Sequence, residues 1–279
     1  MARVIAIAFV LAACGGRHQV CSIAPKPSAP TAPFLWKVQR TGGPVVWLYG
    51  TVHNGGTGDV PQAAWTALES SARFVSELGD TEPDPEKSGE LARLPPGPGL
   101  DTLLPTDDWY DLRDTMRGMI KEDDLKRLRP WYAMARLTVR ISPPPSPTMD
   151  VAMAKRARAR GIPVDSLESW DVQLKVLADA VKLADLQQAI HARRTMRCEL
   201  DQMHALYLTG DLPIMERILV TGQSEQLLVE RTKLWLTKLE PYFATGGAFV
   251  AVGLGHLAGD AGLPAMLARG GFSVERAAP

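Results

Sequence analysis

Two stretches of the chain repeat the same local pattern, and this repeat limits the possible folds more than any other feature. VVWLYGTVHNG at 45–55 and AFVAVGLGHLAG at 248–259 each combine an apolar strand, a Gly-x-x-His motif and a glycine-rich loop. Pro61 and Pro264 each stand eight residues after the histidine and are expected to start a helix. A short strand then carries a glutamate three residues after a phenylalanine, in RFVSELG and GFSVERA. The chain therefore contains two strand–loop–helix–strand units.

The region between the two units is helical in its pattern. Apolar residues recur at helical spacing from about 101 to 240, with breaks near 210–211 and 221–222. The order β-rich, α-rich and β-rich again predicts an α/β fold. In this fold the two units form one mixed sheet core, with a large helical insertion between them. Each unit places a histidine at the carboxyl end of a strand, where open α/β sheets place their binding sites.

Other local signals predict further elements. FLWKVQR and VVWLYG, separated by a turn at Thr41–Pro44, predict a hairpin. Asp107 or Asp108 is expected to cap a helix that begins near Trp109. Pro130 is expected to start another helix, because proline suits the first helical position.

Three more segments complete the expected pattern. MDVAMAKRARARG at 149–161 predicts a helix capped by Thr148 or Asp150, whose KRARARG end is expected to be a solvated face. IPVDSLES predicts a strand closed at Glu168. The polar, Pro/Gly-rich span 81–99 predicts an excursion over the surface.

The N-terminal residues have the features of a bacterial export signal. Arg3 precedes an apolar run that ends in small residues, and Leu11-Ala12-Ala13-Cys14 resembles a lipobox. Residues 1–13 are therefore expected to form a lipoprotein signal peptide. Cys14 would carry the lipid and hold the chain at the periplasmic face of the cell envelope, as an outer-membrane lipoprotein.

A tether and one domain are expected to follow. The Pro/Ala-rich residues 14–33 predict an extended tether between anchor and fold. The domain is expected over 34–279, with its helical insertion at about 101–240. Cys21 and Cys198 are the other two cysteines of the chain. Disulfides persist in exported proteins, so these two could pair, but the sequence leaves their pairing open.

The charge balance argues against nucleic acid as the main partner. The 279 residues include 31 Lys and Arg and 31 Asp and Glu, whereas phosphate binding needs a basic excess. The chain also lacks a Gly-x-Ser-x-Gly elbow, a Walker loop and a His-Glu-x-x-His motif. These absences disfavour the enzyme classes that are built on those motifs.

Two histidines in the same strand-end context predict a metal centre more strongly than one would. His53 and His256 with a carboxylate would form a usual ligand set for Zn²⁺, Mn²⁺ or Co²⁺, with an open position for water. Glu77 is the first candidate carboxylate, because a glutamate in so apolar a strand is costly unless it is paired or ligating. A structural role for the histidines and a salt bridge for Glu77 stay open as alternatives.

The other titratable candidates are weaker. Glu275 stands beside Arg276 near the C-terminus and is expected to be solvated. Three histidines fall in predicted helices or in the tether and are expected to be structural or exposed: His18, His191 and His204. Three further carboxylates fall near strand ends: Asp80, Asp150 and Glu168.

Seven segments from Leu35 to Glu275 together carry a family resemblance. The segments are LWKV at 35–38, LYGTVHNG at 48–55, VPQAAWTALESSARFVSEL at 60–78, LRPWYA at 128–133, MDVAMAKRARARGIPVDSLES at 149–169, LVERTKLW at 228–235 and FVAVGLGHLAGDAGLPAMLARGGFSVER at 249–276. With this set, the chain resembles the TraB/GumN family, which includes the Tiki proteases. The two Gly-x-x-His motifs with a glutamate between them, in this order, are the most specific part.

The resemblance implies both a fold and a site. It implies an α/β fold related to haem-binding and erythromycin-esterase-type proteins, and the better-studied members resemble metal-dependent peptidases. The residues that match the family's site are His53, Glu77 and His256. Arg231 matches an arginine that asparagine usually follows, whereas Thr232 follows it here. This departure leaves open which hydrogen bonds form beside Arg231.

Motifs and resemblance together predict an envelope-anchored metal-dependent hydrolase, in particular a peptidase acting on peptides or proteins. Its catalytic residues would be His53, Glu77, His256 and Arg231, and the first three would bind Mn, Co or Zn. The chain would contact the membrane through the lipid at Cys14, and no nucleic acid is expected. The alternatives are a haem- or metal-binding lipoprotein without turnover, and a scaffold lipoprotein of the same fold.

Overall fold

A six-stranded mixed sheet forms the centre of the fold. The structure, a computed structural model, describes residues 32–78, 82–220 and 225–278. Within these residues the strands lie in the order β4-β3-β5-β2-β1-β6. The sheet and its surrounding helices confirm the predicted α/β class. The strands are β1 (Leu35–Gln39), β2 (Val46–Thr51), β3 (Arg73–Ser76), β4 (Val164–Ser166), β5 (Ala248–Gly253) and β6 (Ser273–Arg276).

Four neighbouring strands of this sheet run parallel. β2 pairs with β5, β5 with β3, and β3 with β4. Gly50 lies opposite Val252 and Thr51 opposite Gly253, so the two Gly-x-x-His segments leave the sheet side by side. β1 forms the predicted hairpin with β2. Because parallel strands end at the same edge of a sheet, the residues that follow these four strands come together.

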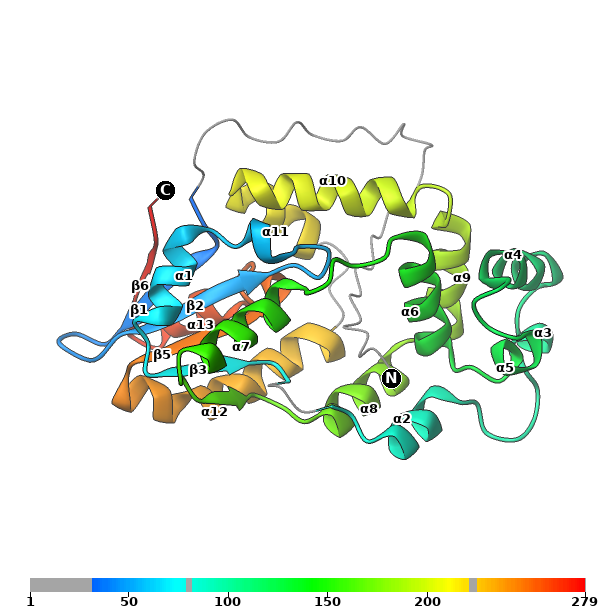
Figure 1. The fold of residues 1–279 in the computed structure, drawn as a ribbon, viewed down its shortest axis with the longest axis horizontal. Helices are drawn as coiled ribbons and strands as arrows, with labels where there is room; N and C mark the ends of the chain where they lie inside the picture. The colour runs from blue at the N-terminus through cyan, green and yellow to red at the C-terminus, as the bar shows by residue number, and fades with distance from the viewer. Residues whose placement is uncertain (1–31, 79–81, 221–224, 279) are drawn as a thin grey trace.

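One group of helices packs on the sheet. Figure 1 shows α7 in front of the sheet and α13 behind it. Phe74, Trp235 and Phe249 are fully buried between these layers. The helices of this group are α1 (Gln62–Glu69), α7 (Met149–Ala159), α10 (Met196–Thr209), α11 (Leu212–Val220), α12 (Glu230–Thr245) and α13 (Leu263–Arg269), with the 3₁₀ turns η1 (Thr57–Asp59) and η3 (Leu254–His256).

A second group of helices has a core of its own. Leu112, Trp131 and Leu186 are buried in it, and the Trp131 indole N–H donates to the carbonyl oxygen of Leu91 at 2.7 Å. Figure 1 shows this group on the right, with the arrowheads of β2 and β3 pointing toward it. Its helices are α2 (Pro85–Ala92), α3 (Leu100–Leu103), α4 (Thr106–Met116), α5 (Glu122–Lys126), α6 (Pro130–Ile141), α8 (Trp170–Ala180) and α9 (Leu183–Ala192), and a π-helical turn, η2 (Glu225–Val229), leads into α12.

The predicted helical insertion at about 101–240 is divided between the two groups. α3–α6, α8 and α9 belong to the second group. α7 and β4 contact β3, and α10, α11 and α12 pack on the sheet core, so these elements of the range belong to the sheet layers. The chain therefore returns to the sheet in the middle of the insertion. This return places Glu168, which follows β4, at the same edge as the other strand ends.

The span 81–99 lies mostly at the surface, as expected in its described part, but it also contains a helix, α2, that was not predicted. The Asp84 carboxylate accepts hydrogen bonds from the backbone N–H groups of Glu86 and Lys87. Pro85 takes the first helical position, where its missing N–H costs nothing. A complete helix start was therefore present in a span whose proline and glycine content suggested a loop.

The predicted start of the helix near Trp109 is also wrong by three residues. α4 begins at Thr106, so Asp107 and Asp108 lie in its first turn rather than at its cap. Asp108 is buried and lies 2.7 Å from His191 Nε2 of α9. The acidic side chain links two helices instead of capping one, and His191 has the structural role that was predicted.

The second strand–loop–helix–strand unit ends differently from the first. β3 returns to the sheet beside β5, whereas β6 pairs antiparallel with β1 at the opposite edge. Glu275 lies opposite Lys37 in this pair. The glutamate of the second unit therefore lies far along the sheet from the glutamate of the first, outside the strand-end cluster.

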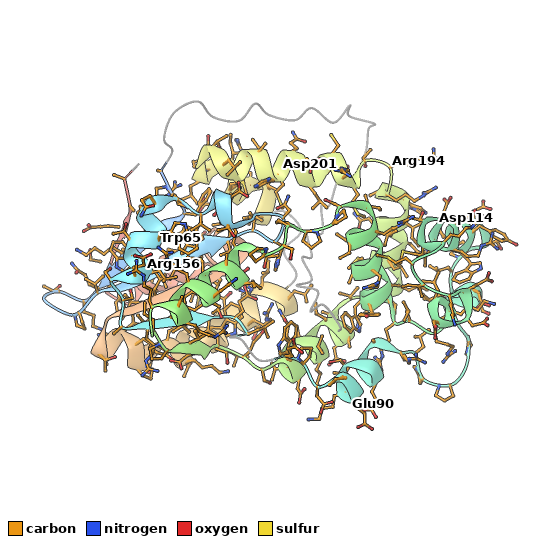
Figure 2. The ribbon with its side chains drawn as sticks, viewed as in Figure 1. Trp65, Glu90, Asp114, Arg156, Arg194 and Asp201 are labelled. Atoms are coloured by element: carbon orange, nitrogen blue, oxygen red, sulfur yellow. The ribbon has the colours of Figure 1, made fainter. Side chains whose placement is uncertain are left out.

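The basic end of α7 is a solvated face, as predicted. Arg156 and Arg160 are half-exposed, and both bind the carboxylate of Glu69 on α1. Figure 2 shows Arg156 and Trp65 of α1 on the same side of the molecule. The ion pairs of these two arginines tie α7 to α1.

Several predictions fall outside the described residues. They concern the signal peptide, the tether, Cys14, Cys21 and Asp80. Cys198 on α10 is disulfide-bonded, and its partner is not among the described residues. Within the described ranges, no helix combines the length and apolar character needed to cross a membrane.

Candidate functional site

The ends of the four parallel strands carry the candidate site. His53 lies two residues after β2, and Glu77 directly follows β3. Glu168 lies two residues after β4, and His256 ends η3, which follows β5. Both histidines act electrostatically on Glu77. The fold therefore places these four residues at one edge of the sheet.

The glycines of the two Gly-x-x-His motifs permit close approaches at this edge. The N–H of Gly253 donates to Glu77 Oε1 at 2.7 Å, and a Cβ atom on Gly253 would lie 3.2 Å from that oxygen. A Cβ atom on Gly50 would lie 2.6 Å from Leu254 Cδ1. The missing side chains thus let one strand end bind a carboxylate and let the other pack against η3.

Arg231 of α12 joins the two strand-end glutamates. Its Nη2 lies 2.5 Å from Glu168 Oε1 and 3.2 Å from Glu77 Oε2, and its Nε donates to Glu168 Oε2 at 3.2 Å. Its Nη1 donates to the carbonyl oxygen of Leu227 at 3.0 Å. Arg231 is 8% exposed and Glu168 is 5% exposed, so water reaches this ion pair poorly. Glu77 does form the salt bridge that the sequence left open as an alternative.

Two further side chains of α12 contact His256 of η3. Thr232 Oγ1 lies 2.8 Å from His256 Nδ1. The rings of Trp235 and His256 pack with their centroids 4.1 Å apart, and the Trp235 indole N–H donates to Glu168 Oε2 at 3.2 Å. One helix thus supplies a cation, a hydroxyl group and an indole ring to three strand ends.

The charges of these groups follow from their surroundings. Burial, assisted by Arg231 and opposed by Glu77, lowers the pKa of His256 to about 3, so the imidazole is neutral at pH 7. Burial alone would raise the pKa of Glu77, but His256, Arg231 and the Gly253 N–H outweigh it and lower that pKa below its ordinary value. The site therefore combines a neutral imidazole with an ionised carboxylate.

His53 and Asp150 lie on the β2 side of the site. Asp150, in the first turn of α7, accepts a hydrogen bond from Thr51 Oγ1 at 2.9 Å. Burial raises the pKa of Asp150, and Glu77 adds to this while His53 opposes it. Nδ1 of His53 is buried and has no hydrogen-bond partner in the described part of the chain. Because an unpaired buried polar atom is costly, His53 has an unused binding capacity here.

The donor set fits a divalent metal in its chemistry. Residues 32–78, 82–220 and 225–278 contain no group of three or more His, Cys, Asp or Glu side chains already arranged to hold a metal ion. His53 nevertheless offers an unpartnered nitrogen, His256 is neutral and Glu77 is ionised. The bond between Thr232 and His256 resembles the outer hydrogen bonds that orient metal-ligating histidines. The fit of His53, Glu77 and His256 to a metal therefore rests on their donor chemistry and not on an arrangement of three ligands.

Sequence reasoning missed two contributions of α12. It assigned no role to Trp235, and it left the bonding of Thr232 open. Arg231 and Trp235 are four residues apart and so share a helix face, which is a signal that LVERTKLW contains. The pairing of that face with His256 was not visible, because it depends on where α12 meets η3.

The chain matches a known protein family. The model of the TraB/PrgY/gumN family matches residues 34–276. This range includes both Gly-x-x-His motifs and all the residues gathered at the strand ends. No curated protein and no solved structure shows a significant match to the chain.

Proposed function

The chain belongs to the TraB/PrgY/gumN family, and from this premise we propose that it is a metal-dependent hydrolase of peptide bonds, acting at the strand-end site. The observation that carries the proposal is the meeting of two strand-end histidines with an ionised glutamate. His53, Glu77 and His256 would hold a divalent Mn, Co or Zn ion, and such an ion supplies a Lewis acid that activates water and polarises a carbonyl group.

The chain's own residues have separate tasks in this proposal. Arg231 and the Gly253 N–H hold the Glu77 carboxylate in place and keep it ionised. His256 stays neutral and so keeps a nitrogen lone pair available at pH 7. Asp150 accepts a hydrogen bond from Thr51 beside the site, and its burial raises its pKa above the ordinary value. These tasks together match the requirements of amide hydrolysis.

The same proposal includes a place in the cell and a class of substrate. The lipobox at Leu11–Cys14 supports removal of residues 1–13 and attachment to the envelope through lipid on Cys14. The protein would then face the periplasm as an outer-membrane lipoprotein and act on peptides or proteins there. Equal numbers of acidic and basic residues support the absence of nucleic acid as a partner.

Peptide hydrolysis by the full chain tests the proposal. A mixed peptide library is incubated with the protein after loading with Mn²⁺, Co²⁺ or Zn²⁺, and new termini are identified by mass spectrometry. We expect cleavage that chelation abolishes and that His53→Ala reduces by about a hundredfold or more. His191→Ala is the matched control, because His191 lies on α9 and binds Asp108 outside the site.

Two outcomes would contradict this proposal. The first is cleavage that survives His53→Ala at the wild-type rate. The second is the absence of cleavage together with a Soret absorbance band on titration with haem, which would favour the binding alternative.

A further inference from the structure

The hydroxyl group of Thr232 has one hydrogen and lies within hydrogen-bond distance of two acceptor atoms. Thr232 Oγ1 donates to the carbonyl oxygen of Leu228 at 2.7 Å, one turn earlier in the chain. The same oxygen lies 2.8 Å from Nδ1 of His256. A carbonyl oxygen can only accept, and two oxygens 2.7 Å apart need a hydrogen between them, so the hydroxyl hydrogen is assigned to Leu228 and the oxygen is left to accept from His256. In this arrangement Nδ1 would carry the imidazole hydrogen and Nε2 the lone pair.

We infer that Thr232 is a positioning residue that fixes the tautomer and the orientation of His256. Its consequence for catalysis rests on the hydrolase function proposed above. Thr232 is 1% exposed and His256 is 3% exposed, so water does not replace this bond. Trp235 packs against the imidazole with ring centroids 4.1 Å apart and restricts its rotation. Nε2 is thus the ring nitrogen that can bind a metal or take a proton.

Three substitutions separate this role from a general effect on folding. Thr232→Val keeps the shape of the side chain and removes the hydroxyl group, while Thr232→Ser keeps the hydroxyl group. Thr138→Val is the matched control, because Thr138 Oγ1 also donates to the carbonyl oxygen four residues earlier, that of Met134, at 3.0 Å. That bond lies in α6, in the second group of helices. If Thr232→Val changed the protein only by removing the hydrogen bond from the threonine hydroxyl to the carbonyl one turn earlier, Thr138→Val would cause the same change.

The direct readout is the tautomer of His256 at pH 7. Two-bond ¹H–¹⁵N correlation spectra of the ¹⁵N-histidine-labelled full chain distinguish a protonated ring nitrogen from one with a lone pair. The signals of His256 are identified by their loss in a His256→Gln variant. We expect the Nδ1–H form alone in the wild type, in Thr232→Ser and in Thr138→Val. In Thr232→Val we expect a mixture with the Nε2–H form.

The kinetic readout follows the tautomer. We expect Thr232→Val to lower kcat about tenfold to a hundredfold, and Thr232→Ser to restore most of it. An unchanged single tautomer in Thr232→Val, or the Nε2–H form in the wild type, would overturn the inference. A wild type without any hydrolysis would overturn the proposed function instead, and the spectra would still decide the role of Thr232.

Discussion

Replacing Arg231 with methionine is expected to lower the free energy of unfolding by about 3–5 kcal/mol. The substitution keeps a long apolar side chain and removes the positive charge beside the carboxylates of Glu168 and Glu77. Two negative groups would then share a poorly hydrated space without a counter-charge. Chemical denaturation at neutral pH, followed by circular dichroism, measures the loss.

Two further variants make the result specific to the buried charge. Arg73→Met removes a surface ion pair to Asp165, whose arginine side chain is 47% exposed, and should cost less than about 1 kcal/mol. Arg231→Met combined with Glu168→Gln should recover part of the loss, because one of the unpaired carboxylates is gone. Similar small losses for Arg231→Met and Arg73→Met would show that the ion pair of α12 does not stabilise the strand ends as described.

Acidification is expected to destabilise the wild type more steeply than a His256→Gln variant. The pKa of His256 is about 3 in the folded chain, against an ordinary value of 6.5. Between these values the unfolded chain binds a proton at His256 and the folded chain does not. Stability therefore falls as the pH drops from 6.5 toward 3, by at most about 1.4 kcal/mol per pH unit.

The test compares how steeply the free energy of unfolding changes with pH in the two chains, and not its absolute value. Free energies of unfolding are measured for both chains between about pH 7 and pH 5, with a chelator present so that metal binding does not enter. The two curves should separate by as much as about 2 kcal/mol over this range. Parallel curves would mean that the imidazole of His256 is accessible to protons in the folded protein.

The sequence predicted the parts of the fold that depend on local pattern. Each Gly-x-x-His unit contains an apolar strand, a break and a helix start, and these signals act over a few residues. The hairpin of β1 and β2 was predictable for the same reason. The placement of His53 and His256 at one edge of the sheet then followed from the general rule on parallel strands, because β2 and β5 are neighbours.

The parts that depend on distant pairing were not predictable from one sequence. Arg231 is 154 positions from Glu77 and 63 from Glu168, and only the order of strands brings the three together. The two units are alike in sequence, but β2 already pairs with both β1 and β5. The last strand, β6, therefore adds to the free side of β1, and Glu275 lies away from the site.

Metal content is the measurement that tests the central claim most directly. The full chain, reconstituted with Mn²⁺, Co²⁺ or Zn²⁺ and desalted, is analysed by inductively coupled plasma mass spectrometry beside a His53→Ala/His256→Ala variant. A His191→Ala/His204→Ala variant controls for the loss of two histidines outside the site. The strand-end metal site predicts about one ion per chain in the wild type and the control, and loss of the ion in the His53/His256 variant. An equal metal content in all three chains, or no metal in any of them, would contradict it.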